Sequence, residues 1–302
     1  MQNKTTKAVL CATLGNIIWG FSFLFTKVGL EFVHNPNVML AHRFFLSSLF
    51  MLVPLLIGRS RISFRGKKWG LVLLLLLMQL CYYLFESYAL LYTNTTISGL
   101  VLAAVPVVAI GTGIVFLKEY PTKRQVLFCV LPVTGVIMIT VSGGEMGVIP
   151  LRGGIFLLLT LLSSAIYKTV NRRVAEEFSP YERTFMVLTI SALTFAVAGL
   201  KSVSWDVSTF FAPLMHPKYF GAVVSLSLFC SIGANLLVNY AAGNMSVFKV
   251  SSFGSLSTLC AALVGVVFLK EPVSAALILG AILILVGIRL VTKSQQEGKR
   301  NV

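Results

Sequence analysis

The chain has 302 residues, of which 57% are hydrophobic and only 12% are charged, and its mean hydropathy is +0.88. Soluble domains carry about 25% charged residues, so this composition excludes a soluble globular protein and indicates an integral membrane protein. The net charge of +15 does not indicate nucleic-acid binding, because the cations are distributed over alternate loops and form no single patch.

The apolar segments predict an all-α integral membrane fold with ten transmembrane helices. A helix needs roughly 20 apolar residues to cross the hydrocarbon layer, and the chain has room for about ten such spans with short connections. The segment at 184–200 is the weakest of them, since it is short and contains Thr and Ser. The expected spans are 8–29, 37–57, 69–91, 96–117, 125–142, 152–172, 184–200, 218–241, 247–268 and 275–292.

The loop cations predict the orientation of the chain in the membrane. If the N-terminus is cytoplasmic, the inside segments hold most of the Lys and Arg residues, and the outside segments hold only Arg152, Lys201, Lys218 and Lys270. By the positive-inside rule, both termini are therefore expected in the cytoplasm, and the lipid bilayer is a partner of the basic loops. The first span contains no small-residue cleavage pattern, so we expect a retained helix and not a signal peptide.

The five cysteines all fall inside expected spans and form no close pair, so they are read as packing residues. His42 has no second ligand at metal spacing. We therefore expect no metal site and no cofactor.

The two halves of the chain repeat. Val115–Glu119 recurs 152 positions later as Val267–Glu271, and the same spacing matches Gly135 to Gly287. Five spans are an odd number, so the second copy must enter the membrane from the opposite side, which is typical of transporters. We expect a first repeat at 1–145, a second and inverted repeat at 150–294, and a cytoplasmic tail at 295–302.

The residues after the shared motif agree with an inversion. The first copy continues with Thr122-Lys123-Arg124 and the second with Ser274-Ala275-Ala276, so the basic pair is present only where the loop should be cytoplasmic. Glu119 and Glu271, which precede prolines, are expected to interact with the N-terminus of the span that follows each of them.

Several short groups of residues, from Trp19-Gly20 and Arg43-Phe44 to Leu117-Lys118-Glu119, form a familiar pattern. In these residues the chain resembles the EamA-type drug/metabolite transporters, and the resemblance covers residues 8 to 292. The resemblance implies a bacterial inner-membrane carrier, commonly an exporter of amino acids or other metabolites, with a central cavity lined mainly by spans 1, 3, 4, 6, 8 and 9. It also implies a proline in the ninth span, where this chain has Thr258 at the position equivalent to Pro106. The matching residues are Trp19-Gly20, Phe21-Ser22-Phe23, Lys27, Arg43-Phe44, Tyr92-Thr93, Ser98, Gly99, Pro106 and Leu117-Lys118-Glu119.

Glu86 is the only acid well inside an expected span. Ionisable groups at mid-depth cost about 2.5 to 3.5 kcal/mol and are functional candidates by default. Glu86 lies roughly 8 Å from the outer end of its span at 1.5 Å per residue, and Arg43 and Lys27 have similar depths. Two readings stay open: a structural ion pair of Glu86 with Arg43 or Lys27, and a functional role of Glu86 in binding a coupling proton or a substrate amine.

Polar and aromatic residues on the expected cavity helices are candidates to bind substrate, although interhelical hydrogen bonds are the alternative for each of them. Lys168 and Lys249 lie near the cytoplasmic surface, where they can snorkel or attract an anionic group. The candidate cavity residues are Asn16, Trp19, Phe23, Gln79, Tyr83, Glu86, Tyr167, Lys168, Asn235 and Asn239.

These patterns predict a secondary transporter that works by alternating access on a small metabolite. The sequence contains no Walker-type Gly-Lys-Ser/Thr, so a gradient must supply the energy, with protons as one candidate. The alternatives are an integral-membrane lipid- or prenyl-modifying enzyme, for which the ten acids are too scattered, and a passive facilitator. We expect no enzymatic activity, and a homodimer remains possible.

Overall fold

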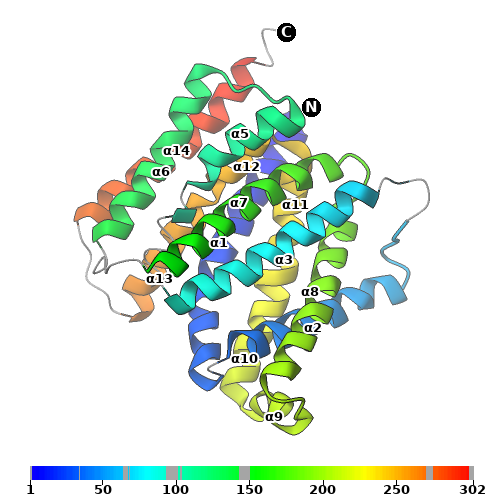
Figure 1. Ribbon diagram of the computed structural model, residues 1–302. Coiled ribbons are helices and arrows are strands. Elements are labelled where there is room, and N and C mark those ends of the chain that lie inside the picture. The colour runs from blue at the N-terminus through cyan, green and yellow to red at the C-terminus, as the bar shows by residue number, and fades with distance from the viewer. Residues whose placement is uncertain are drawn as a thin grey trace.

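The computed structural model describes residues 2–33, 35–63, 67, 69–92, 101–102, 104–142, 150–269 and 275–298 (Figure 1). Every secondary-structure element in these ranges is a helix. The elements are α1 Gln2–Phe32, α2 Pro36–Leu56, α3 Trp69–Tyr92, α5 Val105–Leu117, α6 Lys123–Ser142, α7 Leu151–Val174, α8 Pro180–Ser202, α9 Val207–Phe211, η1 Ala212–Met215, α10 Pro217–Ser225, η2 Leu226–Gly233, α11 Ala234–Asn244, α12 Val247–Phe253, α13 Ser255–Leu269 and α14 Ala275–Gly298.

The expected all-helical membrane fold is confirmed for the described residues. Six helical stretches are long and apolar enough to cross a bilayer: Lys4–Phe32, Pro36–Leu56, Trp69–Glu86, Leu151–Val174, Pro180–Ser202 and Pro217–Asn244. Val105–Leu117, Val126–Met138 and Ala275–Leu290 are shorter apolar helices. The full set of ten spans in two inverted repeats remains a prediction, and α14 continues into the expected tail as far as Gly298.

The segment expected to be weakest, 184–200, forms the 23-residue helix α8. It starts earlier than predicted because Ser179 and Glu182 form a capping box and Pro180 occupies the first turn. The Thr184 hydroxyl donates to the carbonyl of Pro180 at 2.8 Å, so this polar group is satisfied within the helix. Local capping therefore compensates for the low apolar content of the segment.

Three of the expected spans are not continuous α-helices. The span expected at 247–268 is divided at Gly254, whose carbonyl accepts from the Ser257 hydroxyl at 2.7 Å. In the first copy, α5 begins at Val105 after a turn at Ala104, with Pro106 in its first turn. The ninth span has Thr258 where the family resemblance implies a proline. Its helix is nevertheless interrupted, because the break lies at Gly254.

The third interruption is a π-helix that the sequence analysis did not predict. The span expected at 218–241 consists of α10, the eight-residue π-helix η2 and α11. A π-helix is rare and usually no longer than one turn, and it is found frequently at functional sites. The segment η2 therefore marks the eighth span as a place to look for a binding site.

The helices pair in a pattern that is preserved when the two halves of the chain are exchanged. α2 packs on α8, and α6 on α14; each pair joins equivalent spans of the two halves. α3 packs on α7 and α1 on α11, and exchange of the halves converts one pair into the other. The same holds for α5 with α7 and α1 with α13. In Figure 1, α1 begins and α14 ends on the same side of the molecule, and α9 lies at the opposite end.

Two glycines at equivalent repeat positions bring α6 and α14 together. A Cβ atom at Gly135 would lie 2.8 Å from Ile284 Cγ1 and 2.5 Å from the Gly280 carbonyl oxygen. A Cβ atom at Gly287 would overlap Cδ of Pro132. Pro132 and Ile284 also occupy equivalent positions, so the contact is nearly symmetric. Small residues allow backbones to approach closely where the surroundings are apolar.

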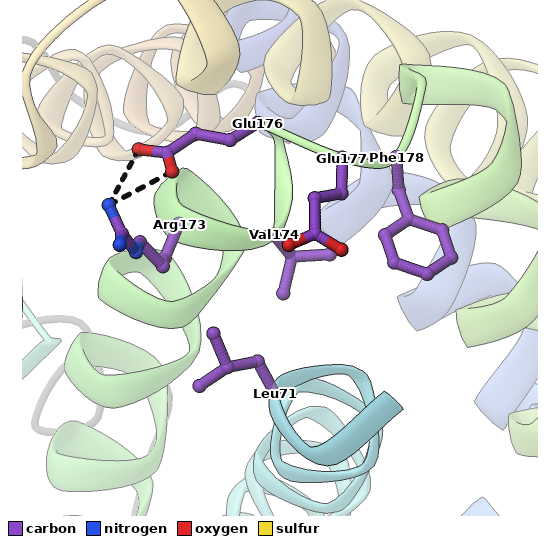
Figure 2. A pocket seen from close by; sticks show the side chains of 6 residues that line it. All are labelled: Leu71, Arg173, Val174, Glu176, Glu177 and Phe178. Atoms are coloured by element: carbon purple, nitrogen blue, oxygen red, sulfur yellow. Dashed lines mark hydrogen bonds and ion pairs between the residues drawn. The ribbon is translucent and has the colours of Figure 1, made fainter. Parts of the chain in front are cut away.

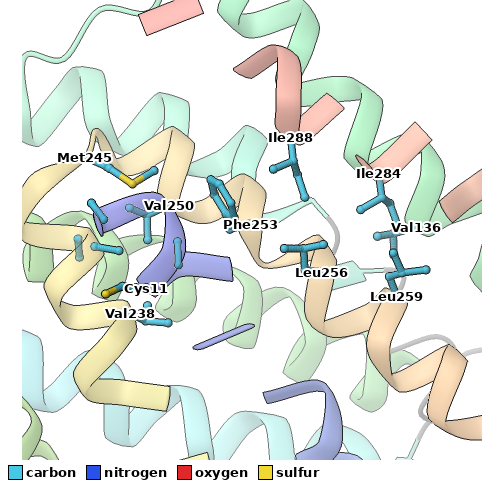
Figure 3. Close-up of a cluster of buried hydrophobic side chains, with 14 of the residues drawn as sticks. Cys11, Val136, Val238, Met245, Val250, Phe253, Leu256, Leu259, Ile284 and Ile288 are labelled. Carbon is cyan, nitrogen blue, oxygen red and sulfur yellow. The ribbon is translucent and has the colours of Figure 1, made fainter. Parts of the chain in front are cut away.

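A large cluster of buried apolar side chains fills the space between α1, α6 and α11 to α14. Figure 3 shows Cys11 and Val238 on one side of this cluster and Ile284 and Leu259 on the other. Cys11 is 8% exposed, which agrees with its assignment as a packing residue. The cluster combines helices from both halves of the chain.

Candidate functional site

The candidate site begins at Glu86, in the last two turns of α3. Its Oε1 atom accepts a hydrogen bond from the Tyr82 hydroxyl at 2.6 Å. The two residues are four positions apart on one helix, a spacing at which side chains meet. The carboxylate is thus held by a neutral donor from its own helix.

Arg43, on α2, is also held by a neutral partner. Its Nε donates to the Ser231 hydroxyl of the π-helix η2 at 2.7 Å. The Ser227 hydroxyl, one turn earlier in η2, donates to the backbone carbonyl of Arg43 at 2.9 Å. The indole Nε1 of Trp19 donates to the carbonyl of Cys230 at 3.0 Å, so α1 contacts the same segment. We call Arg43, Tyr82, Glu86 and Ser231 the central cluster.

The structure does not form the ion pair between Glu86 and Arg43 that the sequence analysis kept open. These two described side chains interact electrostatically, but no nitrogen and oxygen of the pair come within the 4.0 Å of an ion pair. The physical reason is that each group has a closer neutral partner, Tyr82 or Ser231. The side chains of Lys27 and Phe23 lie outside the described part of the structure.

Gln79, Tyr83 and Tyr167 extend the central cluster toward α7. Gln79 and Tyr83 are hydrogen bonded to each other, and both are largely buried. The Tyr83 ring packs against Phe44, with centroids 4.8 Å apart. Tyr167 interacts electrostatically with Tyr83 and with Arg183. These three residues lie between the central cluster and a second polar group.

Asn16 and Asn235, two of the three asparagines predicted to line the cavity, donate hydrogen bonds to backbone carbonyls of their own helical spans. The Asn16 amide donates to the carbonyl of Ala12 at 2.7 Å, and the Asn235 amide donates to the carbonyl of Ser231 at 2.7 Å. Both side chains are nearly inaccessible. Asn235 nevertheless lies one turn from Ser231 in the eighth span, next to the central cluster.

Asn239 belongs to a separate buried network of α7, α8 and α11. Its Oδ1 accepts from the Asn171 amide at 2.7 Å, and its amide donates to the Thr184 hydroxyl at 2.8 Å. The Arg183 guanidinium donates to Asn171 Oδ1 at 2.6 Å and to the Asn239 carbonyl at 2.6 Å. Arg183 is only 1% exposed. We call these four residues the asparagine network, and its buried hydrogen bonds between three helices indicate a structural role.

Lys168 and Lys249, which were both expected near the cytoplasmic surface, differ in their surroundings. Nζ of Lys168 lies 3.6 Å from the position that a Cβ atom on Gly254 would occupy, beside the break in the ninth span. Lys249 is 1% exposed, so the expectation that it snorkels to the surface is wrong. The short helix α12 directs it inward, and all seven residues of this helix are buried.

Glu119 connects the two halves of the chain. Its Oε2 accepts from the backbone N–H of Val247 at 3.1 Å, and its Oε1 lies 3.3 Å from Nε of Arg172. The expected partner was the N-terminus of the following helix α6, and the structure shows the N-terminus of α12 in its place. Anions are stabilised at helix N-termini wherever the fold brings them, so sequence proximity was a poor guide. Glu271 lies outside the described residues.

A small hollow of about 60 Å³ lies where the turn between α7 and α8 meets α3 (Figure 2). Arg173 and Glu176 form an exposed ion pair at 2.9 Å on its edge, and Leu71 closes it from α3. An adjoining cavity of about 310 Å³ reaches Arg183 and Tyr240. None of the ten residues predicted from the sequence to bind substrate lines either space.

Sequence reasoning missed the partners that hold the charged groups. Ser231 was not selected because a serine in an apolar span is common, and only the π-helix brings it to Arg43. Tyr82 had a detectable signal, since it stands four residues before Glu86. Arg183 was counted as a loop cation and is instead buried in α8.

Comparisons with known proteins agree with this architecture. The model of the EamA-like transporter family matches residues 6–141 and again residues 151–293. The uncharacterized transporter YcxC of Bacillus subtilis (strain 168) is 32% identical over 292 residues, which cover 95% of this chain and 93% of that protein. An uncharacterized transporter of Archaeoglobus fulgidus is 25% identical over 302 residues, covering 98% and 100% of the two chains.

A solved crystal structure has the same fold. It superposes with a TM-score of 0.80 at 18% sequence identity and covers 94% of this chain and 98% of its own. The family model covers both halves, the relative in Bacillus subtilis exceeds 30% identity, and the structure is a multi-pass helical membrane protein. The chain therefore belongs to the EamA-like transporter family.

Proposed function

We propose that this protein is a gradient-driven secondary transporter of the bacterial inner membrane that exports amino acids or related small metabolites by alternating access. Its relatives are named as transporters, and their substrates are not part of those names. Inverted halves that rock about a central site are the usual architecture of such carriers.

One observation carries the proposal: the central cluster holds an acid and a base that form no ion pair with each other or with any other described residue. Glu86 is bonded to Tyr82, and Arg43 is bonded to Ser231. Unpaired charges at membrane depth are costly and are retained mainly for function. The Glu86 carboxylate on α3 and the Arg43 guanidinium on α2 complement the ammonium and carboxylate groups of an amino acid. Glu86 is also the candidate to bind a coupling proton.

The proposed inversion of the two halves has independent support. Helix pairs α2–α8 and α6–α14 join equivalent spans, and the remaining major pairs exchange with one another. The close contacts of Gly135 and Gly287 follow the same exchange. An even number of spans places both termini on one side, and the positive-inside rule makes that side cytoplasmic.

The test is transport by purified protein in proteoliposomes. With a high concentration of unlabelled L-amino acids inside the vesicles and a trace of the radiolabelled mixture outside, a carrier accumulates label transiently by counterflow, whereas a passive channel does not. We expect Glu86→Gln to abolish net flux, or to remove its response to an imposed pH gradient, in protein that still inserts. Glu31→Gln, at an exposed acid near the end of α1, is the matched control. Full flux and an unchanged pH response in Glu86→Gln would remove Glu86 from the mechanism.

A further inference from the structure

We propose that Ser231 positions the Arg43 guanidinium as the receptor for the carboxylate group of the transported molecule, and that the π-helix η2 places Ser231 for this purpose. The inference rests on the proposed function and identifies the residue that sets affinity in the central cluster. Ser231 is a positioning residue, because it acts on substrate through Arg43.

The first step is how Arg43 is held. Ser231 occupies the Nε–H, at 2.7 Å, and no other hydrogen bond from this guanidinium to a described residue is formed. The nearby Phe44 ring, 5.4 Å from Cζ, contacts the group through its π-face. Within the described part of the chain, its two terminal nitrogens therefore have no hydrogen-bond partner. Such a pair of parallel N–H groups matches a carboxylate in a bidentate arrangement, which a lysine cannot reproduce.

The second step is the rigidity of the element that carries Ser231. The side chain of Ser231 is inaccessible, at 0% exposure, so its hydroxyl has little freedom to turn elsewhere. The Ser47 hydroxyl of α2 donates to the backbone carbonyl of Ser227 at 3.5 Å, and the indole of Trp19 in α1 donates to the carbonyl of Cys230. These contacts hold the π-helix from two neighbouring helices. Preorganised donors of this kind lower the cost of binding a charged group.

The third step separates this role from ordinary helix packing. Ser227 and Ser231 lie in the same π-helix, and both are 0% exposed. Each makes one hydrogen bond with Arg43, in which the Ser227 hydroxyl donates and the Ser231 hydroxyl accepts. Ser227 contacts only the backbone carbonyl, whereas Ser231 contacts the guanidinium. A packing role predicts equal effects of removing either hydroxyl, but a positioning role predicts an effect of Ser231 alone.

The experiment measures uptake of a radiolabelled L-amino acid mixture into proteoliposomes, and its inhibition by L-alanine and by L-alaninamide. In Ser231→Ala, we expect the half-saturating concentration to rise about tenfold, the factor for one lost hydrogen bond to a charged group, at an unchanged maximal rate. L-alanine, which has a carboxylate, should inhibit wild-type uptake more strongly than L-alaninamide, which has none. Ser231→Ala should lose this difference between the two inhibitors. Ser231→Thr should restore it, and Ser227→Ala should change neither quantity.

Equal behaviour of Ser231→Ala and Ser227→Ala, or equal inhibition of the wild type by acid and amide, would overturn the inference. If Ser231→Ala does not fold, Arg43→Lys replaces it, with the same expected loss of discrimination. If the wild type transports no amino acid, the proposed function fails, and a binding measurement then decides this inference separately. The double variant Trp69→Phe, Trp205→Phe retains Trp19 as its single tryptophan, and its fluorescence is measured with acetate and with acetamide. An acetate-dependent change that acetamide does not produce, and that Ser231→Ala removes, supports it; no such change refutes it.

Discussion

Replacing Glu119 by alanine tests whether the two halves of the chain are held together at the end of α5 by this one carboxylate. The substitution removes the acceptor for the Val247 N–H at 3.1 Å and the partner of Arg172 at 3.3 Å. Arg172 also donates to the carbonyl of Gly243 at 3.4 Å, so the cluster joins the ends of α5, α7 and α11 to the start of α12. These contacts must break if the halves separate on this side.

The expected magnitude follows from the two interactions. A side-chain cap of a helix N-terminus contributes about 1 kcal/mol. The ion pair, with side chains 26% and 23% exposed, adds about 0.5 kcal/mol, since solvent screens it. The sum of about 1.5 kcal/mol corresponds to a shift of about tenfold in the equilibrium between joined and separated ends.

Cys129 reports this equilibrium. It is 0% exposed in α6, accepts from the Ser252 hydroxyl of α12 at 3.4 Å, and packs against Phe248 and Ile110 where α5, α6 and α12 meet. In a variant that retains only this cysteine, we expect Glu119→Ala to raise the rate of labelling by a methanethiosulfonate reagent about tenfold, in proportion to the population of separated ends.

Glu176→Ala is the matched control. It also removes a carboxylate from an arginine partner, but the pair it breaks is exposed, at 55% and 50%, and lies within one turn of chain. We expect no change in labelling of Cys129. If Glu119→Ala labels at the rate of the control, the carboxylate does not hold the two halves together and the reasoning is refuted.

Three further predictions concern the fold. Gly287→Ala should destabilise the protein by about 1–3 kcal/mol, because the added Cβ atom would overlap α6, and the melting temperature in detergent should fall. Gly111→Ala is the control: it has open space around it and should leave the melting temperature unchanged. Asn239→Ala should lower the melting temperature and leave the half-saturating concentration unchanged, since its bonds are structural; a selective rise in that concentration would return it to the binding site. Cysteines introduced at Lys123 and Ala275 should label from opposite sides of the membrane, and labelling from one side would exclude inverted halves.

The sequence predicted what depends on periodicity and composition. The described helices begin and end close to the expected spans, because a membrane helix must satisfy its backbone internally and present apolar residues to lipid. The expected similar depth of Glu86 and Arg43 in the membrane also comes from counting residues at the rise of an α-helix, and it stays a prediction. The position of a helix and the depth of a residue within it are local properties, because the sequence of one segment determines each of them.

The tertiary structure decided which groups meet. The bond between Arg43 and Ser231 joins residues 188 positions apart and depends on a π-helix, for which the sequence carries no periodic signal. Likewise, Glu119 binds the start of α12 and not the nearer α6. The sequence alone therefore determined a membrane protein of repeated helices with a buried acid and base. The neutral partner of Glu86 lies one turn away on its own helix, but only the packing of distant helices decided that Arg43 meets Ser231. Such a partner is set by distance in space and not by distance along the chain.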